Sequence, residues 1–412
     1  DCVDCPYEIY VKGDFDRHLR AFKVFSGFPG SYDPGAFEYG SPSFARAIHV
    51  DPAVQQSGGS GESWSNAVKY LREGIDRAIS SQGEIREVWV KEGVIKLGAP
   101  SSPQALLNLS SGAGGLVIRG GFTGNETSAS QRVPTDRTVL SGDLLGDDDG
   151  TIATLSDNKG PLLTVRGATE LCFERIVFYS GYSANSGGSQ PGAVEVSDSR
   201  LTFRQCDFTS NWGRYTPALR MGQSNAIFDS CVVDSNSGMS ESITGAIYAF
   251  GNSNLRAVSC RFVNNIGGRA GAVQIDDSNL ESTFRWCEFV RNRGTDFSAS
   301  GVLSLRADVL LANCTFFENS SPKVGAVKSE VGTTRAWQCL FVANEAAANI
   351  LEARASAEGP DIRSCMFVGN LSGSALEILG IMPTGIRLVK NTIFWKNSFS
   401  GQVTLSAPAS TA

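Results

Sequence analysis

Cys206-Asp-Phe-Thr-Ser-Asn211 is a clear copy of the repeat that decides the fold. The pattern Cys-x-Phe-x-x-Asn recurs with successive cysteines 25, 29, 27, 27, 25 and 26 residues apart, although one copy has Val for Phe. The seven cysteines are Cys206, Cys231, Cys260, Cys287, Cys314, Cys339 and Cys365. The asparagines are Asn211, Asn236, Asn265, Asn292, Asn319, Asn344, Asn370 and, in a last copy without cysteine, Asn397. A period in the twenties with strand-forming residues in each unit predicts a solenoid.

The repeat also predicts the type of solenoid. Cysteine and phenylalanine two positions apart lie on one face of a strand, and the residue between them, such as Asp207 or Glu288, faces outward. A second marker, Gly-Ala followed by a β-branched residue, lies between the copies at Gly245 and Gly271, where small residues permit close backbone approach. Short strands without helical periodicity predict a parallel β-helix with one turn per repeat. Cysteine, phenylalanine and asparagine then form three ladders with a spacing of ~4.8 Å.

Two motifs carry a family resemblance. The alternation of Gly-Gly-Ala-Ile-like and Phe-x-x-Asn motifs resembles the polymorphic outer-membrane protein repeat. Residues 120–132, Gly-Gly-Phe-Thr-Gly-Asn-Glu-Thr-Ser-Ala-Ser-Gln-Arg, and then Thr138-Val-Leu-Ser-Gly-Asp143 resemble the start of secreted right-handed β-helix proteins of the pectate-lyase-like superfamily. The resemblance covers residues 48–405 and implies an all-β, right-handed parallel β-helix. It does not imply a function, because this superfold carries lyases, hydrolases, adhesins and passive stalks.

The chain is expected to have three parts. These are an irregular extension over residues 1–45, the β-helix over 46–405 with regular turns over 201–403, and a linker or tail over 406–412. Apolar residues at helical spacing predict a helix over 64–80, with Ser63 or Ser65 as N-cap, which covers the N-terminal end of the solenoid. Because the chain begins with Asp1, we expect a processed mature chain or a fragment.

Composition excludes several classes of partner. The net charge of −6 argues against a nucleic-acid partner, and no stretch approaches the ~18 apolar residues of a membrane span. Seven of the ten cysteines occupy one ladder, where they are either buried free thiols or neighbours close enough for disulfides. Cys2-x-x-Cys5 favours a local disulfide in an oxidising compartment over half of a zinc site, since no second Cys-x-x-Cys follows.

An acidic run and two glycosylation sequons are further candidate sites. Asp143, Asp147, Asp148 and Asp149 offer oxygen ligands for Ca²⁺, or form a solvated acidic turn, and the run lacks the alternation of an EF-hand loop. No other cofactor is expected. Asn108 and Asn125 begin Asn-x-Ser/Thr sites that we expect in loops and therefore open to glycosylation, whereas the sequons at Asn319 and Asn370 belong to the ladder.

Catalytic motifs of the fold are missing. Asp276-Asp277 follows a predicted strand, but the Gly-His-Gly of polygalacturonase-like enzymes is absent and no histidine follows His49. The pair is therefore interpreted as a polar turn. A lyase that uses arginine and Ca²⁺ stays open, because its residues would lie on different rungs.

Leu340, Met366 and Ile393 replace polar residues at the outward position of the last rungs and predict an apolar stripe that contacts a partner. The leading hypothesis is a non-catalytic extracellular structural or adhesive module of a cell-surface protein or filament, which binds glycans, other proteins or copies of itself. The alternative is a polysaccharide lyase or glycoside hydrolase acting on acidic polysaccharide. A third hypothesis, compatible with the first, is a fragment of an assembly in which another chain covers the last rungs.

Overall fold

The computed structural model describes residues 47–55, 58–98, 106–149, 151–183, 190–238, 244–295, 299–354, 359–379, 389–398 and 401–406. Contacts divide the chain into two compact units, Asp1–Ala45 and Arg46–Ala412, and all described residues belong to the second. The predicted Cys2–Cys5 disulfide, the predicted extension 1–45 and residues 407–412 lie outside the described residues.

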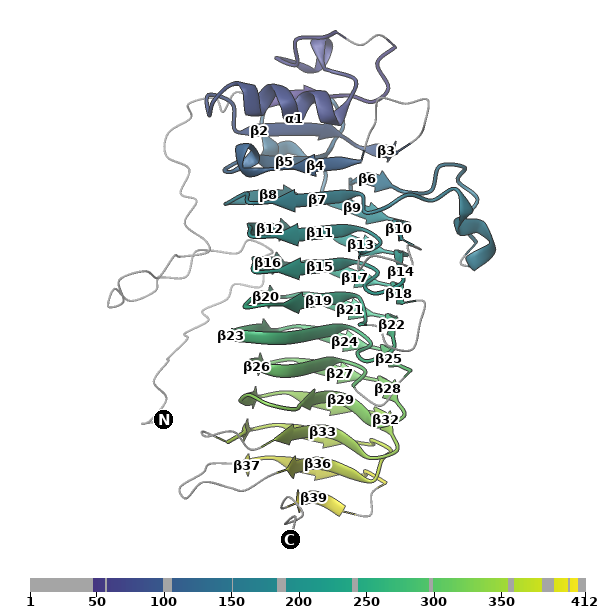
Figure 1. Cartoon of the computed structure of the whole chain (residues 1–412), viewed down its shortest axis with the longest axis vertical. Helices are drawn as coiled ribbons and strands as arrows, with labels where there is room; N and C mark the ends of the chain where they lie inside the picture. Colours follow the sequence, from purple (N-terminus) through teal and green to yellow (C-terminus); the bar gives the residue numbers. More distant parts are fainter. Residues whose placement is uncertain are drawn as a thin grey trace, which may run out of the picture. The chain divides into compact units, whose positions relative to one another are not determined.

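The second unit is a right-handed parallel β-helix of about 10 turns with one α-helix among its described residues (Figure 1). Its strands form three sheets, in which each strand pairs in parallel with its equivalent one turn away. The predicted all-β fold class is confirmed.

The strands of the three sheets are as follows. The 21-stranded sheet contains β1 (Ala47–Val50), β2 (Glu87–Lys91), β4 (Leu107–Leu109), β5 (Val117–Phe122), β7 (Leu163–Arg166), β8 (Leu171–Glu174), β11 (Val194–Ser197), β12 (Arg200–Arg204), β15 (Leu219–Gly222), β16 (Asn225–Asp229), β19 (Ile247–Phe250), β20 (Asn254–Val258), β23 (Val273–Arg285), β26 (Val302–Ala312), β29 (Val324–Ser329), β30 (Thr334–Trp337), β33 (Asn349–Arg354), β34 (Asp361–Arg363), β36 (Ser374–Leu379), β37 (Val389–Lys390) and β39 (Gly401–Ser406). The 11-stranded sheet contains β3 (Gly93–Lys96), β6 (Thr138–Ser141), β9 (Ile176–Tyr179), β13 (Asp207–Thr209), β17 (Val232–Asp234), β21 (Arg261–Val263), β24 (Glu288–Val290), β27 (Thr315–Phe317), β31 (Leu340–Val342), β35 (Met366–Val368) and β38 (Ile393–Trp395). The 7-stranded sheet contains β10 (Tyr182–Ser183), β14 (Trp212–Gly213), β18 (Ser237–Gly238), β22 (Ile266–Gly267), β25 (Arg293–Gly294), β28 (Ser320–Ser321) and β32 (Glu345–Ala346).

The phenylalanine ladder forms part of the core. Phe289 on β24, Phe316 on β27 and Phe341 on β31 are register partners and are fully buried. The rings of Phe289 and Phe316 stack with centroids 4.7 Å apart and planes 4° from parallel. Each rung thus buries a large apolar side chain and adds an aromatic contact with the rungs on either side.

Left-handed residues make two corners of each regular rung. The residue before each ladder asparagine has φ between 50° and 60°, as at Ser210, and the residue before each ladder cysteine has φ between 51° and 56°, as at Gln205. The ladder asparagine itself does not take this conformation, because its side chain is held inside the ladder while its neighbour turns at the surface. Similarly, Arg175, with φ 54°, separates β8 from β9.

The glycines of the second marker permit close packing of adjacent rungs. A Cβ on Gly245 would lie 2.2 Å from the carbonyl oxygens of Ala270 and Gly271, and a Cβ on Gly271 would lie 2.2 Å from that of Ser300. The β-branched residues that follow each Gly-Ala pair, Ile247 and Val273, are fully buried.

The N-terminal helix is shorter than predicted. A 3₁₀ turn, η1, covers Trp64–Asn66 and α1 covers Leu71–Ser80, whereas Ala67 and Val68 between them are extended. Val68 forms a parallel bridge with Val50, and its backbone bonds to His49 and Asp51, which interrupts the predicted helix over 64–80.

The predicted N-cap serines are not used by α1. Ser63 and Ser65 bond to each other, and α1 has Tyr70 as its N-cap residue. Its buried residues Leu71 and Ile75 belong to the main core cluster. The helix α1 lies against β1 and β2 at the N-terminal end of the β-helix (Figure 1).

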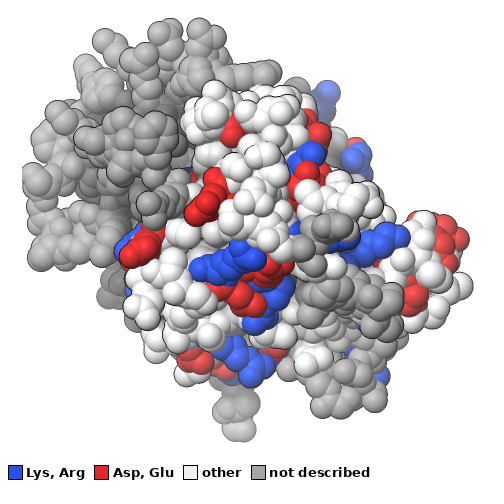
Figure 2. All heavy atoms as spheres, turned by 90° about the horizontal axis from the view of Figure 1, so that it is seen from above, with Lys and Arg blue, Asp and Glu red and all other residues white. Residues whose placement is uncertain are grey.

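The outer side of α1 is polar. Arg72 pairs with Asp76 at 2.9 Å and Arg77 with Glu73 at 2.6 Å. Acidic and basic side chains lie interspersed at this end of the molecule (Figure 2). In the part of the chain that the structure describes, no helix is long and apolar enough to cross a bilayer.

The motif over 120–132 folds back onto the outside of the first rungs. Phe122 is fully buried and its ring stacks on that of Trp89 with centroids 4.7 Å apart. The guanidinium carbon of Arg132 lies 5.0 Å from the centroid of the Phe122 ring. The carboxylate of Glu126 accepts bonds from three successive backbone N–H groups, those of residues 123–125. The motif that carries the superfamily resemblance is thus an anchor for the loop after β5.

Glu174 joins this anchor to the β-helix. Its carboxylate bonds to Arg119 on β5 and to Arg132, and its side chain is 8% exposed. Burial raises the pKa of Glu174, but the two guanidinium groups outweigh it and hold the pKa below its ordinary value.

Candidate functional site

The asparagine ladder is a continuous hydrogen-bonded column. From Asn211 to Asn370, each side-chain Nδ2 donates to the Oδ1 of the asparagine in the next rung, at 2.9–3.0 Å. The same group also donates to a backbone carbonyl of the preceding rung, as Asn236 does to Phe208 at 2.9 Å. Asn319 and Asn370 are 0% and 1% exposed, so their sequons are closed to modification.

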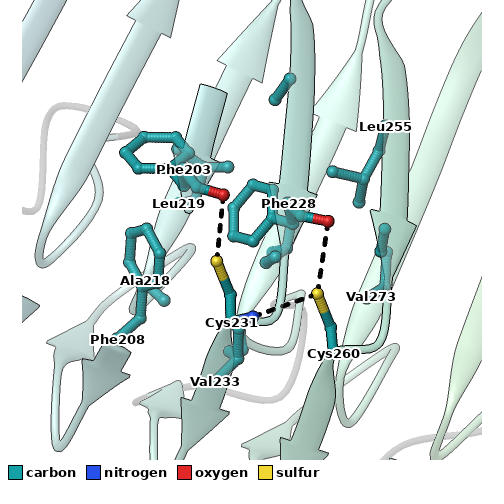
Figure 3. Packing of buried hydrophobic residues seen from close by; sticks show 14 of the residues in the cluster. Phe203, Phe208, Ala218, Leu219, Phe228, Cys231, Val233, Leu255, Cys260 and Val273 are labelled. Atoms are coloured by element: carbon teal, nitrogen blue, oxygen red, sulfur yellow. Dashed lines mark hydrogen bonds between the residues drawn. The ribbon is translucent and has the colours of Figure 1, made fainter. Parts of the chain in front are cut away.

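The cysteine ladder consists of free thiols. Sγ of Cys231 donates to the carbonyl of Phe203 at 3.2 Å, and Sγ of Cys260 donates to that of Phe228 at 3.4 Å (Figure 3). No disulfide links the cysteines of the described residues, so the disulfide alternative for the ladder is wrong. Burial raises the pKa of Cys206 well above that of a free thiol, which fits a role as a small core side chain.

Both predicted glycosylation acceptors are exposed. Asn125 lies in the loop after β5, as predicted. Asn108 lies in the three-residue strand β4 and not in a loop, because its neighbours Leu107 and Leu109 are buried and its own side chain alternates outward. Glycosylation at either position stays a prediction.

The acidic run forms a cluster on the loop between β6 and β7. Carboxylate oxygens of Asp143, Asp147 and Asp148 lie within 4.8 Å of one another, and Asp143 is buried. Asp149 is directed elsewhere: its Oδ1 accepts bonds from the backbone N–H and hydroxyl of Thr151 and from the hydroxyl of Thr154. These bonds, first of all the one from the Thr151 hydroxyl, lower the pKa of Asp149. Only three of the four predicted aspartates therefore come together.

Asp276 and Asp277 lie where β23 bends. Asp277 has φ 51° and its carboxylate bonds to Arg306, whose guanidinium is also 3.4 Å from Asp276. Partial burial, and then the neighbouring carboxylate of Asp277, raise the pKa of Asp276, whereas the bond from Arg306 lowers that of Asp277. The pair forms a salt-bridged corner on the surface.

A second acidic pair lies on neighbouring rungs further along. Glu352 on β33 is the register partner of Glu377 on β36, and Lys328 on β29 is the partner of Glu352 on the other side. Nδ2 of Asn349 bonds to both carboxylates and lies 3.4 Å from Glu352 Oε2. Glu352 is only 3% exposed. This group could not be predicted from the sequence, because residues 25 positions apart carry no signal of proximity until the register is known.

The predicted apolar stripe is present. Leu340, Met366 and Ile393 are register partners on β31, β35 and β38, and the last two are 39% and 54% exposed. Trp395, two residues after Ile393 on β38, is 57% exposed. In earlier rungs the same column is mixed, with the charged residues Asp207, Arg261 and Glu288 and the uncharged Val232 and Thr315, and it is wholly apolar from Leu340 onward.

Comparisons with known proteins agree with the fold. Residues 151–327 match the family model described as right handed beta helix region. No curated protein matches the chain significantly by sequence.

Three solved structures illustrate the likeness. The chain is similar to the surface adhesin PfbA of Streptococcus pneumoniae, with 10% identity over 81% of this chain and 88% of that chain and a TM-score of 0.36. It is similar to the catalytic domain of a GH87 alpha-1,3-glucanase in complex with nigerose, with 11% identity over 90% of this chain and 69% of that chain and a TM-score of 0.45. It is also similar to tailspike protein 3 of bacteriophage CBA120, with 12% identity over 81% and 56% and a TM-score of 0.33.

These likenesses carry no argument about activity, because the identities are near one in ten and the TM-scores lie below 0.5. The family match over residues 151–327 coincides with stacked rungs and with three side-chain ladders. The chain therefore has the right-handed parallel β-helix fold, and residues 151–327 of it match the family model.

Proposed function

We propose that the chain is a non-catalytic structural or adhesive module of a cell-surface protein or surface filament, which binds protein or glycan neighbours outside the cell. The observation that carries this proposal is the unbroken asparagine ladder, which ties eight consecutive rungs together. The recurring cysteines, phenylalanines and asparagines of the regular rungs contact the neighbouring rungs. Such an arrangement provides length and stiffness, as in other solenoids that present extended binding surfaces.

The outer surface supports the same proposal. The exposed apolar stripe at Met366, Ile393 and Trp395 suits a protein neighbour, since Met and Trp are enriched and acidic residues depleted at protein interfaces. Earlier rungs of the column carry charges that keep them in water.

The test uses the full chain. It is incubated with pectate, alginate and glycosaminoglycans, with and without Ca²⁺, while new reducing ends and the absorbance of unsaturated products are followed. In parallel, sedimentation velocity and glycan binding compare the wild type with an Ile393→Glu, Trp395→Glu variant. We expect no cleavage, and a binding partner or self-association that the variant weakens. Cleavage, or a chain that binds neither itself nor any glycan, contradicts the proposal.

A second candidate function is glycoside hydrolysis, favoured by the pair Glu352 and Glu377. Neighbouring rungs lie ~4.8 Å apart, and retaining glycosidases use two carboxyl groups about 5–5.5 Å apart. Glu352 is held by Asn349 on the strand face opposite the core residues Leu351 and Ala353, where Glu352 is buried and Glu377 is half-buried. If the chain cleaves a polysaccharide, the variant Glu352→Gln, Glu377→Gln loses that activity, whereas Asp276→Asn keeps it.

A further inference from the structure

We propose that the loop between β6 and β7 binds one Ca²⁺ ion through Asp143, Asp147 and Asp148, with help from Asn158 later in the same loop. The three carboxylates lie within 4.8 Å of one another. Like charges at this distance repel, and the repulsion is strongest for Asp143, which is 5% exposed. A divalent cation among them removes this repulsion.

Unpaired oxygens provide the second, independent observation. Eight buried side-chain nitrogen or oxygen atoms of the described residues have no hydrogen-bond partner, and four of them belong to this one loop and the rung beneath it. These four are Oδ1 of Asp148, Oδ1 of Asp157, Oδ1 of Asn158 and Oγ of Ser180. A buried acceptor without a partner is costly, and such a concentration at one place points to a missing partner that binds oxygen.

Asn158 is aimed at the cluster. It is 4% exposed, and its Nδ2 donates to Oδ2 of Asp148 at 2.9 Å and to the carbonyl of Ser180 at 3.3 Å. The amide plane is therefore held against the carboxylates by its nitrogen, while its oxygen stays unpaired. An amide oxygen beside carboxylates is a usual component of a Ca²⁺ site.

The remaining bonds hold the loop in place and leave ligand oxygens available. Asp157 Oδ2 accepts the backbone N–H groups of Leu144 at 2.9 Å and Leu145 at 2.7 Å, whereas its Oδ1 is unpaired. Asp143 Oδ1 accepts the N–H of Gly146 at 2.5 Å. Lys96 brings a positive charge to the loop, but its Nζ donates to the carbonyl of Leu144 at 3.0 Å.

The donor set selects the metal. The ligands are carboxylate and amide oxygens, without the histidine or cysteine that zinc prefers. Ca²⁺ accepts six to eight oxygens in flexible geometry, whereas Mg²⁺ usually keeps several waters and binds only one or two carboxylates, so three carboxylates with an amide oxygen favour Ca²⁺.

Calorimetric titration of the chelator-treated full chain with CaCl₂ tests the proposal. We expect one site per chain with a dissociation constant below about 1 mM, the weak end of protein Ca²⁺ sites, and weaker binding of MgCl₂. Asp148→Asn should weaken Ca²⁺ binding at least about tenfold, because it removes a charged ligand. Asp149→Asn is the matched control. It removes the same charge from the next residue, whose carboxylate bonds to Thr151 and Thr154 instead of joining the cluster, so it should change the affinity for Ca²⁺ less than about threefold.

Several outcomes would overturn the inference. One is that the wild type shows no saturable Ca²⁺ uptake in calorimetry and equilibrium dialysis. The other is that Asp148→Asn and Asp149→Asn weaken Ca²⁺ binding equally, which would indicate diffuse counterion attraction. Circular dichroism checks that each variant is folded. If Asp148→Asn does not fold, the exposed Asp147→Asn replaces it with the same expected loss. The proposed module function does not depend on the result.

Discussion

Asparagine ladder variants test whether side-chain amides hold the rungs together. Asn265 is fully buried at the middle of the ladder and makes four hydrogen bonds. Its Nδ2 donates to the carbonyl of Val233 at 2.8 Å and to Asn292 Oδ1 at 2.9 Å. Its Oδ1 accepts the backbone N–H of Asn236 at 3.2 Å and the side-chain Nδ2 of Asn236 at 2.9 Å. Asn265→Ala removes all four bonds.

The expected loss follows from these contacts. At about 1 kcal/mol net per bond, the variant loses about 4 kcal/mol of unfolding free energy, and the buried N–H of Asn236 is left without its acceptor. Asn397 is the matched control at the end of the ladder. It makes three such bonds, but it is half-buried and water replaces them, so Asn397→Ala should cost about 1–2 kcal/mol.

Guanidinium unfolding followed by tryptophan fluorescence gives both values. If the unfolding free energies of the two variants depend equally steeply on guanidinium concentration, the same part of the chain unfolds in both, and their free energies can be compared. A loss at Asn265 below about 1 kcal/mol, or equal losses at both positions, would refute the ladder as a source of stability. Asn265→Asp adds a pH readout: the buried carboxylate should be tolerated better at low pH, where its protonated form donates to the carbonyl of Val233.

Three further variants or conditions test other parts of the fold. Gly245→Ala places a Cβ 2.2 Å from two carbonyl oxygens and should cost more than about 3 kcal/mol, whereas Gly112→Ala meets only a methyl group at 3.3 Å and should stay within about 1 kcal/mol, as measured by thermal unfolding. The thiol of Cys206 should resist a thiol reagent in the folded chain. Burial raises the pKa of Cys206, and it raises that of Cys172 to about 11. The free energy of unfolding should therefore be constant below pH 9.0, the ordinary thiol pKa, and fall as the pH rises above it, because the thiols then ionise only in the unfolded chain. A denaturation midpoint that rises above pH 9.0 contradicts the prediction. Glu174→Gln should cost about 3 kcal/mol, because the buried Arg132 loses its carboxylate partner and Arg119 keeps only Glu87. The two arginines outweigh burial and lower the pKa of Glu174 in the folded chain. Ionised Glu174 therefore stabilises the wild type fully above pH 4.5, the ordinary pKa of the side chain, and this stabilisation is lost as the pH falls through the lower pKa of the folded chain. The free energy of unfolding of Glu174→Gln should not show this loss at acid pH.

The solenoid could be predicted because its signals are local. The two-residue spacing of Cys206 and Phe208 sets a strand face, and the constant distance to the next copy sets the rung. The start of α1 could not be predicted in the same way. The apolar spacing over 64–80 is helical, but Val68 pairs with Val50 on β1, and a tertiary bridge of this kind overrides a local pattern.

The candidate sites were predicted only where they are contiguous in sequence. Asp143, Asp147 and Asp148 belong to one acidic run, and they come together. Asn158 returns to them only after the 3₁₀ turn η4 (Ile152–Ser156), and nothing in the run indicates that return. Glu352 and Glu377 come together through rung register, which varies because rungs contain 25 to 29 residues.

The asparagine column also has an electrical direction. From Asn211 to Asn370 each amide has its NH₂ group toward the next rung, and from Asn236 to Asn397 each amide has its oxygen toward the previous one. The amide dipoles add, as peptide dipoles do in a helix, and each polarises the next. The column therefore has a partial positive end at Asn397 and a partial negative end at Asn211, before any ionised side chain is counted. The negative end at Asn211 is buried under the preceding rungs, whereas Asn397 at the positive end is half-buried, so an uncharged side chain gives the last described rungs a partial positive charge.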